Sequence, residues 1–139
     1  MGGGCMGKRW RPAVILGLAC VAALSALAEE EKATRLETAR WAAGLNAKSE
    51  GGREWTARNV PTIGRLITPV LNGCLPETGD EVTAFSVFVR LSRKGRVLEV
   101  LTDLDASLGA CMTDGARNLQ FPEPPRDDYW VQVNLAASL

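Results

Sequence analysis

Cysteines and carboxylates are the residues of this chain whose types could do chemistry. The sequence contains four cysteines, Cys5, Cys20, Cys74 and Cys111, and no histidine. Without histidine the chain lacks the commonest general base, the usual catalytic triads and most catalytic zinc sites. No two cysteines have the spacing of a thioredoxin-like redox motif, and no glycine-rich loop has a phosphate-binding spacing. The sequence therefore predicts no catalytic residue, metal or cofactor.

Aspartates form the remaining candidates for acid–base or calcium chemistry. They are Asp103, Asp105, Asp114, Asp127 and Asp128. Asp103 and Asp105 begin like a calcium-binding loop, but the rest of an EF-hand does not follow. Aspartates at such positions are typical of helix caps and turns, so we expect structural roles for them. A small secreted enzyme or enzyme inhibitor with an unrecognised carboxylate or disulfide site stays open as the alternative.

The first 28 residues have the three parts of a secretory signal peptide. A basic start is followed by an uncharged apolar run over residues 13–28, which ends on Ala26-Leu27-Ala28. This run is shorter than the ~20 residues that a membrane-spanning helix needs. We predict cleavage after Ala28 and a periplasmic or secreted protein; an uncleaved leader would instead tether the protein to the membrane. Lipidation at Cys20 is a weaker alternative, because Gly17 stands where leucine is normally wanted.

Removal of the leader changes the charge and leaves two cysteines. The chain has 16 basic and 16 acidic residues, and the leader takes three basic ones, which leaves 13 against 16 and a net charge of −3. This mild acidity argues against nucleic acid as a partner. Cys74 and Cys111 remain as an even pair in an oxidising compartment, which favours a disulfide. Separate burial of the two as small apolar residues is the alternative.

Alternation and helical spacing predict the fold of residues 82–135. Residues 82–92 and 96–102 read as two strands around an Arg93-Lys94-Gly95 turn, and residues 129–135 alternate cleanly as a last strand. Between them a helical stripe that includes Leu108 and Met112 starts near Asp105 or Ser107 and should end at the proline-rich segment 121–125. The sequence thus predicts an α+β fold: a three-stranded antiparallel sheet of order ββαβ with a helix across one face.

Two further helices should precede the sheet. Residues 29–43 have a thin apolar stripe of Leu36, Ala39 and Ala43, so this helix either packs loosely or docks a partner. A connector spans residues 44–52. A second helix is expected over residues 62–73, with Pro61 in its first turn and Pro69 kinking or breaking it. The predicted organisation is a signal peptide (1–28), an N-terminal helix and linker (29–52) and an α+β domain (53–139).

Three segments of the chain carry a resemblance to a known family. They are Gly95-Arg96-Val97-Leu98-Glu99-Val100, the helix around Cys111, and Phe121-Pro122-Glu123-Pro124-Pro125. Together they resemble the C-terminal domain of the TonB energy-transducer family, and most closely its two-cysteine AgmX/PglI-type branch. Cys74 and Cys111 occupy the two cysteine positions of that branch. The resemblance implies that Cys111 faces the sheet and that the two Cα atoms lie within about 7 Å, the limit for a disulfide.

The resemblance also implies a function. It implies a non-catalytic binding or assembly module that engages a cell-envelope protein by adding a strand to a sheet edge. The expected edge is the last strand, with Tyr129, Trp130, Val131, Gln132 and Val133 as candidate binding residues. The chain lacks the anchor with a functional histidine and the long proline-rich spacer of an energy transducer, so energy coupling is not expected.

Overall fold

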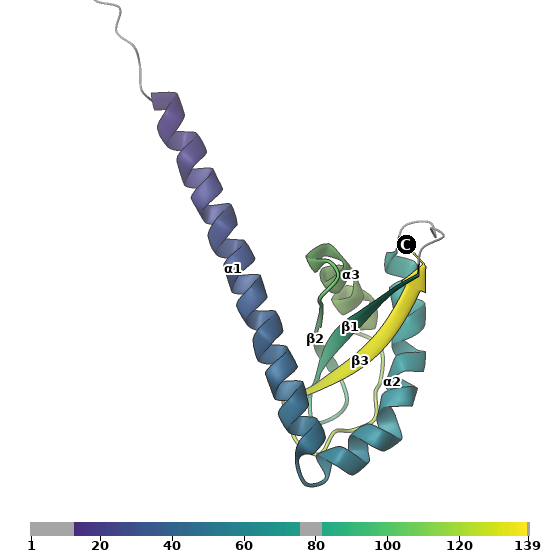
Figure 1. Cartoon of the computed structure of the whole chain (residues 1–139). Helices are drawn as coiled ribbons and strands as arrows, with labels where there is room; N and C mark the ends of the chain where they lie inside the picture. The colour runs from purple at the N-terminus through teal and green to yellow at the C-terminus, as the bar shows by residue number, and fades with distance from the viewer. Residues whose placement is uncertain (1–12, 76–81, 139) are drawn as a thin grey trace, which may run out of the picture. The chain divides into compact units, whose positions relative to one another are not determined.

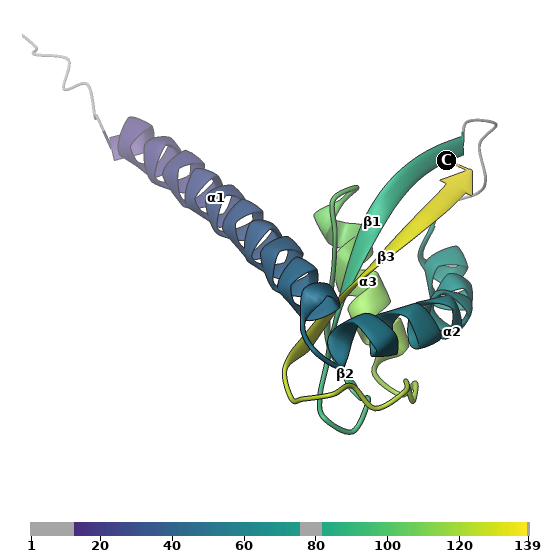
Figure 2. The same ribbon diagram turned by 60° about the horizontal axis from the view of Figure 1, so that its bottom comes forward.

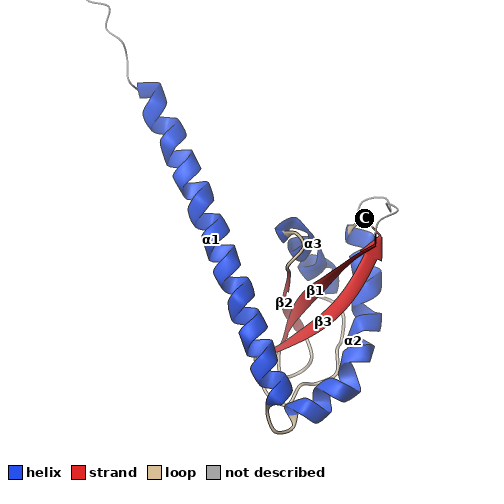
Figure 3. Cartoon of the chain, in the orientation of Figure 1, coloured by secondary structure: helices blue, strands red, loops and turns tan. Residues whose placement is uncertain are grey.

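A computed structural model describes residues 13–75 and 82–138 of the chain, and side chains from residue 23 onward. The elements in chain order are α1 (Ala13–Lys48), α2 (Gly52–Cys74), β1 (Val82–Leu91), β2 (Val97–Thr102), α3 (Ala106–Ala116) and β3 (Tyr129–Ser138) (Figures 1 and 3). Residues Thr34–Leu139 form one compact unit, and the first part of α1 belongs to a separate one. The compact unit therefore begins within the segment 29–52 that the sequence set apart as helix and linker.

The sheet has three antiparallel strands in the order β2-β1-β3. β1 pairs with β3 along its whole length, from Val82 opposite Ser138 to Leu91 opposite Tyr129. β2 covers only the second half of β1, from Val87 opposite Thr102 onward. The predicted α+β class with a three-stranded antiparallel sheet is confirmed, and the order of strands and helices matches the predicted layout in part.

The turn between β1 and β2 depends on Gly95. Its φ angle is +76°, which glycine adopts without a steric penalty, and a Cβ there would lie 2.1 Å from the carbonyl oxygen of Phe121. The backbone of Phe121 donates to Gly95 O at 2.9 Å, so the proline-rich segment is anchored on this turn. The predicted role of Gly95 in the hairpin is confirmed.

A β-bulge explains why β2 alternates poorly. Glu99 pairs with Arg90 and Val97 pairs with Leu91, which leaves Leu98 as an extra residue in β2. Val97 and Val100 are consequently both buried on one face, while Leu98 is 45% exposed.

One face of the sheet forms the main core with α2 and α3. Its alternate residues pack against the apolar stripes of both helices. The core includes Ile63, Ile67, Leu71, Val87, Val89, Val100, Met112, Val131 and Val133.

The opposite face carries a second, smaller core under the part of α1 that belongs to the compact unit. Phe88 is fully buried against Ala39 and Ala43, and Leu36 and Trp130 pack around them. The small side chains of Ala39 and Ala43 let the backbone of α1 approach the sheet. The narrow apolar stripe of this helix is therefore enough to pack against Phe88. The expectation of a helix on one face was therefore incomplete, because helices cover both faces.

Helix α2 differs from its prediction in its start and in the place of Pro61. It starts at Gly52, ten residues before the predicted Thr62, and Pro61 and Pro69 both lie inside it. The placement of Pro61 in a first turn was therefore wrong, and Pro69 does not break the helix. The helix changes direction along its length (Figure 2), as interior prolines cause. The early start has a tertiary cause: the Trp55 ring packs edge-on against Tyr129, with centroids 5.1 Å apart.

Helix α3 starts as predicted and ends early. The Asp105 carboxylate accepts from the backbone N–H of Ser107 at 2.8 Å, which confirms the predicted cap. The helix ends at Ala116, whereas the sequence predicted an end at the prolines. The chain leaves the helix because Gln120 forms a β-bridge with Arg96, next to the anchored Phe121.

Candidate functional site

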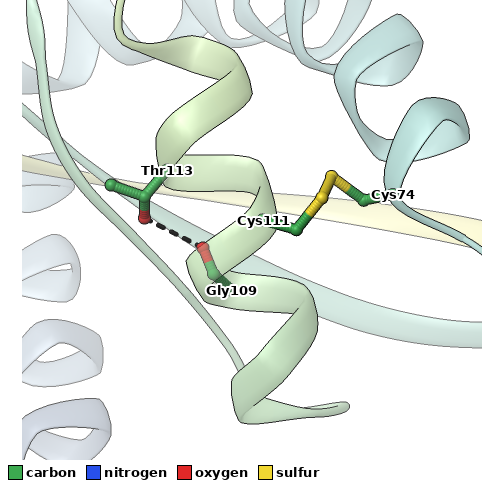
Figure 4. Close-up of a disulfide and its surroundings, with 4 residues drawn as sticks. All are labelled: Cys74, Gly109, Cys111 and Thr113. Carbon is green, nitrogen blue, oxygen red and sulfur yellow. Dashed lines mark hydrogen bonds between the residues drawn. A yellow bond between two sulfur atoms is a disulfide. The ribbon is translucent and has the colours of Figure 1, made fainter.

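The two cysteines of the compact unit form a disulfide. The Cys74 and Cys111 sulfurs are 2.05 Å apart, and their Cα atoms are 5.8 Å apart, within the predicted limit. Figure 4 shows the bond joining the end of α2 to the middle of α3. The expectation that Cys111 faces the sheet was wrong: Cys111 is exposed, and Leu108 and Met112 are the buried residues of that helix. The disulfide therefore fixes α3 to α2 from the outer side of the helical layer.

Helix α3 closes one edge of the sheet, that of β2. The backbone N–H of Val100 donates to the Thr113 hydroxyl oxygen at 2.9 Å. The Thr113 hydroxyl in turn donates to Val100 O at 3.1 Å. The same hydroxyl is 2.9 Å from Gly109 O, the bond drawn in Figure 4. Gly109 permits the close approach, because a Cβ there would lie 3.3 Å from Val100 O. The outward N–H of Val100 thus has a partner within the chain, and the single hydroxyl proton of Thr113 is shared between Val100 O and Gly109 O.

The opposite edge, along β3, is open in the part of the chain that the structure describes. In an antiparallel strand the backbone groups of alternate residues point to opposite sides. The carbonyl of Trp130 accepts from the Asn46 side chain at 3.0 Å, outside the ladder with β1. Residues of the same parity therefore direct their N–H and C=O away from β1. Of these residues, Gln132, Asn134 and Ala136 are exposed, and Ser138 at the end of the strand is half-buried.

Asn46 closes the first part of this edge. Its amide holds Trp130 O, its carbonyl oxygen accepts from the Tyr129 hydroxyl at 3.3 Å, and its Oδ1 accepts from Arg126. Asn46 is 6% exposed, so these contacts satisfy a buried polar side chain at the corner between α1 and α2. The open edge therefore begins after Trp130.

The five residues predicted to bind at this edge fall into two groups, those whose backbone is already bonded within the chain and one that is open. Tyr129, Val131 and Val133 pair with β1 and bury their side chains, and the carbonyl of Trp130 is already bonded. Gln132 alone of the five predicted residues presents both outward backbone groups without such a contact. Asn134 lay within the predicted edge strand 129–135 but not among the five candidate residues, and Ala136 lay beyond that predicted strand. The sequence signal that could have identified them is the alternation of inward and outward positions, which continues to the end of β3.

Polar side chains accompany the open edge on the sheet face that α1 covers elsewhere. The Ser86 hydroxyl donates to Asn134 Oδ1 at 3.0 Å, and the Gln132 amide donates to Ser86 Oγ at 3.2 Å and to Asn134 Oδ1 at 3.1 Å. No residue of Tyr129–Ser138 is charged. A long, uncharged edge strand lacks the lysines and prolines with which proteins usually discourage strand pairing.

A charged cluster lines an open pocket of about 290 Å³ between α1 and the sheet. Glu99 pairs with Arg35, and Arg90 pairs with Asp128 at 3.0 Å. The Arg90 guanidinium also lies 5.8 Å from the centre of the Trp130 ring. Acidic and basic groups alternate and neutralise one another, so the cluster attaches α1 to the sheet and carries no excess charge for a ligand.

The aspartates occupy caps and turns. Asp103 accepts from Ser86 N at 2.9 Å, and Asp127 accepts from Arg93 N at 2.8 Å. Asp105 caps α3, Asp114 pairs with Arg117 three residues on, and Asp128 has a positive φ of 52° before β3. Over residues 23–75 and 82–138, no three acidic or cysteine side chains are grouped as metal ligands would be.

Comparison with known proteins yields no match to a protein-family model, to a curated protein or to a solved structure. The TonB-like resemblance therefore stays a prediction. Among the helices of the described residues, none is both long and apolar enough to cross a membrane. The disulfide is compatible with an oxidising compartment such as the periplasm or the extracellular space.

Proposed function

We propose that this protein is a non-catalytic, extracytoplasmic protein-binding module that receives a strand of its partner along the open edge of β3. The partner is a protein of the cell envelope, and the module resembles the TonB C-terminal domain in this mode of binding. The predicted signal peptide, cleaved after Ala28, delivers it to the periplasm or the exterior, and the disulfide between Cys74 and Cys111 forms there.

The difference between the two sheet edges carries this proposal. Thr113 bonds the outward groups of Val100, and α3 packs along β2, since a Cβ at Gly109 would lie 3.3 Å from Val100 O and 3.7 Å from Thr102 N. Helix α3 therefore occupies the place where a further strand would pair with this part of β2. The outward groups of Gln132, Asn134 and Ala136 meet no such side chain in the described part of the chain. Unsatisfied main-chain groups in a row provide affinity for an extended segment, and the neighbouring side chains provide specificity.

Site-specific crosslinking in the producing cell tests the proposal. A photo-reactive amino acid at Gln132 should give an adduct with a defined protein, whereas the same residue at exposed Arg117, after α3, should not. The substitution Asn134→Pro removes one outward N–H at an edge where proline is tolerated, and it should abolish the adduct. Asn134→Ser keeps the N–H and is the matched control.

The control variants also define what would contradict the proposal. An adduct that forms equally from Arg117, or that survives Asn134→Pro in a folded protein, would mean that the open edge of β3 does not bind the partner. Circular dichroism of the purified variant establishes that it is folded.

A further inference from the structure

We infer that two copies of this chain associate through the side of α1 that faces away from the sheet, with the two helices antiparallel. This inference goes beyond the proposed function, because the contact does not use the edge of β3. The residues concerned form the outer stripe of α1, which consists of Glu37, Trp41, Gly44 and Lys48, with Leu45 beside Trp41. All of them lie in the compact unit that starts at Thr34.

The outer stripe lies opposite the buried side of α1. Ala39 and Ala43 pack on Phe88 of the sheet, and at about 100° per residue Trp41 and Leu45 each lie roughly 200° further around the helix. Trp41 is 69% exposed and Leu45 is 47% exposed. Two large apolar side chains one turn apart thus form a patch that faces solvent in the single chain, as surfaces that bind another protein do.

Gly44 indicates a close contact on the same side of the helix. No atom of the described residues lies within 4 Å of a Cβ placed at Gly44, so packing within the single chain gives no reason for a glycine. Glycine inside a helix destabilises it relative to alanine. Its place on the outer stripe does let an aromatic ring from outside lie directly on the helix backbone, and Trp41 of a second copy supplies such a ring.

The outer stripe is self-complementary about a two-fold axis between residues 42 and 43. The spacing i, i+4, i+7, i+11 keeps its four residues on one side of the helix. In an antiparallel pair around that axis, Trp41 of each copy lies over Gly44 of the other, and Glu37 lies opposite Lys48. A parallel pair would instead bring Glu37 against Glu37 and Lys48 against Lys48. Charge complementarity therefore favours an antiparallel second copy.

The charges of α1 divide between the two sides of the helix. Arg35 pairs with Glu99 of the sheet. Glu37 and Lys48, on the outer stripe, form no ion pair with another residue of the described part of the chain. Charged pairs at the rim of a contact set its register and orientation more than its affinity, and this is the role that the two residues have in the paired helices.

Sedimentation and light scattering across a concentration series test the association on the chain as the cell produces it. The unaltered protein should be a dimer, and Trp41→Ala should weaken the dimer roughly thirtyfold or more, because the ring over Gly44 is lost. Gly44→Ala should raise the urea midpoint of the monomer, since alanine favours a helix, and should still weaken the dimer roughly fivefold or more. Leu98→Ala removes a side chain of β2 that is 45% exposed, and this control should leave the dimer intact.

Single engineered cysteines test the antiparallel arrangement. In a chain that starts at Glu29, Cys74 and Cys111 form the disulfide, so an added cysteine is the free thiol. Glu37→Cys alone and Lys48→Cys alone should give no linked dimer under oxidation, because like positions lie about 16 Å apart along the antiparallel helices. An equimolar mixture of the two variants should give a disulfide-linked dimer.

The outcomes decide the inference independently of the proposed function. A protein that is monomeric at every concentration overturns it, and so does a Trp41→Ala or Gly44→Ala variant that associates as tightly as the unaltered protein. A linked dimer of Glu37→Cys alone would show a parallel contact and would overturn the antiparallel one. The adduct at Gln132 is measured separately, so it can survive the loss of the dimer, and its absence would leave the dimer unaffected.

Discussion

Replacing Thr113 by valine tests the closure of the β2 edge. Valine has almost the shape of threonine, so the packing stays while the hydroxyl that bonds Val100 N and Val100 O is lost. Each half-buried backbone group left without a partner costs about 1–3 kcal/mol. We therefore expect Thr113→Val to lower the free energy of unfolding by roughly 2–4 kcal/mol.

Urea denaturation followed by circular dichroism measures this loss. With a slope of about 1.5 kcal/mol per molar urea, the midpoint should fall by roughly 1.3–2.7 M. Thr113→Ser is the matched control, because it keeps the hydroxyl and removes one methyl group, at a cost of about 1 kcal/mol. A valine variant as stable as the serine variant would refute the role assigned to the Thr113 hydroxyl.

Three further predictions concern the disulfide, the hairpin turn and the leader. Replacing Cys74 or Cys111 by serine should destabilise the protein by roughly 2–4 kcal/mol, and coincident urea curves with and without reductant would contradict this. Gly95→Ala should lower the free energy of unfolding by roughly 2 kcal/mol or more, since a Cβ would lie 2.1 Å from Phe121 O at a φ of +76°. A urea midpoint equal to that of the unaltered protein would speak against that contact. Intact mass of the isolated protein should match a chain that starts at Glu29 without free thiols, and an intact leader would show the predicted cleavage to be wrong.

The strands could be predicted from the sequence because their signals are local. The alternation of β1 and β3 and the glycine at the turn each depend on neighbours in the chain. The bulge at Leu98 blurred the pattern of β2 without hiding the strand. The cap at Asp105 was predictable for the same reason.

The helices were harder to predict because distant contacts decide their bounds. Trp55 packs on Tyr129 and Asn46 bonds Trp130, so the corner between α1 and α2 depends on a strand more than seventy residues away. The thin stripe of Leu36, Ala39 and Ala43 predicts a helix but not the sheet face that it covers.

The candidate site was predictable only in outline. The last strand could be named as an edge, yet its open part depends on Asn46, which closes the edge at Trp130. The closure of the other edge by Thr113 left no local signal, since threonine inside a helix usually bonds only its own preceding turn. The difference between the two edges is therefore a property of the folded chain.

Residue-resolved amide hydrogen exchange tests the central claim most directly, on the complex as isolated from the cell and on the separated chain. The amides of Gln132, Asn134 and Ala136 should exchange quickly in the separated chain and slowly in the complex. The Val100 amide, held by Thr113, should be protected in both. A complex that leaves the three β3 amides in fast exchange while protecting another surface would contradict the account.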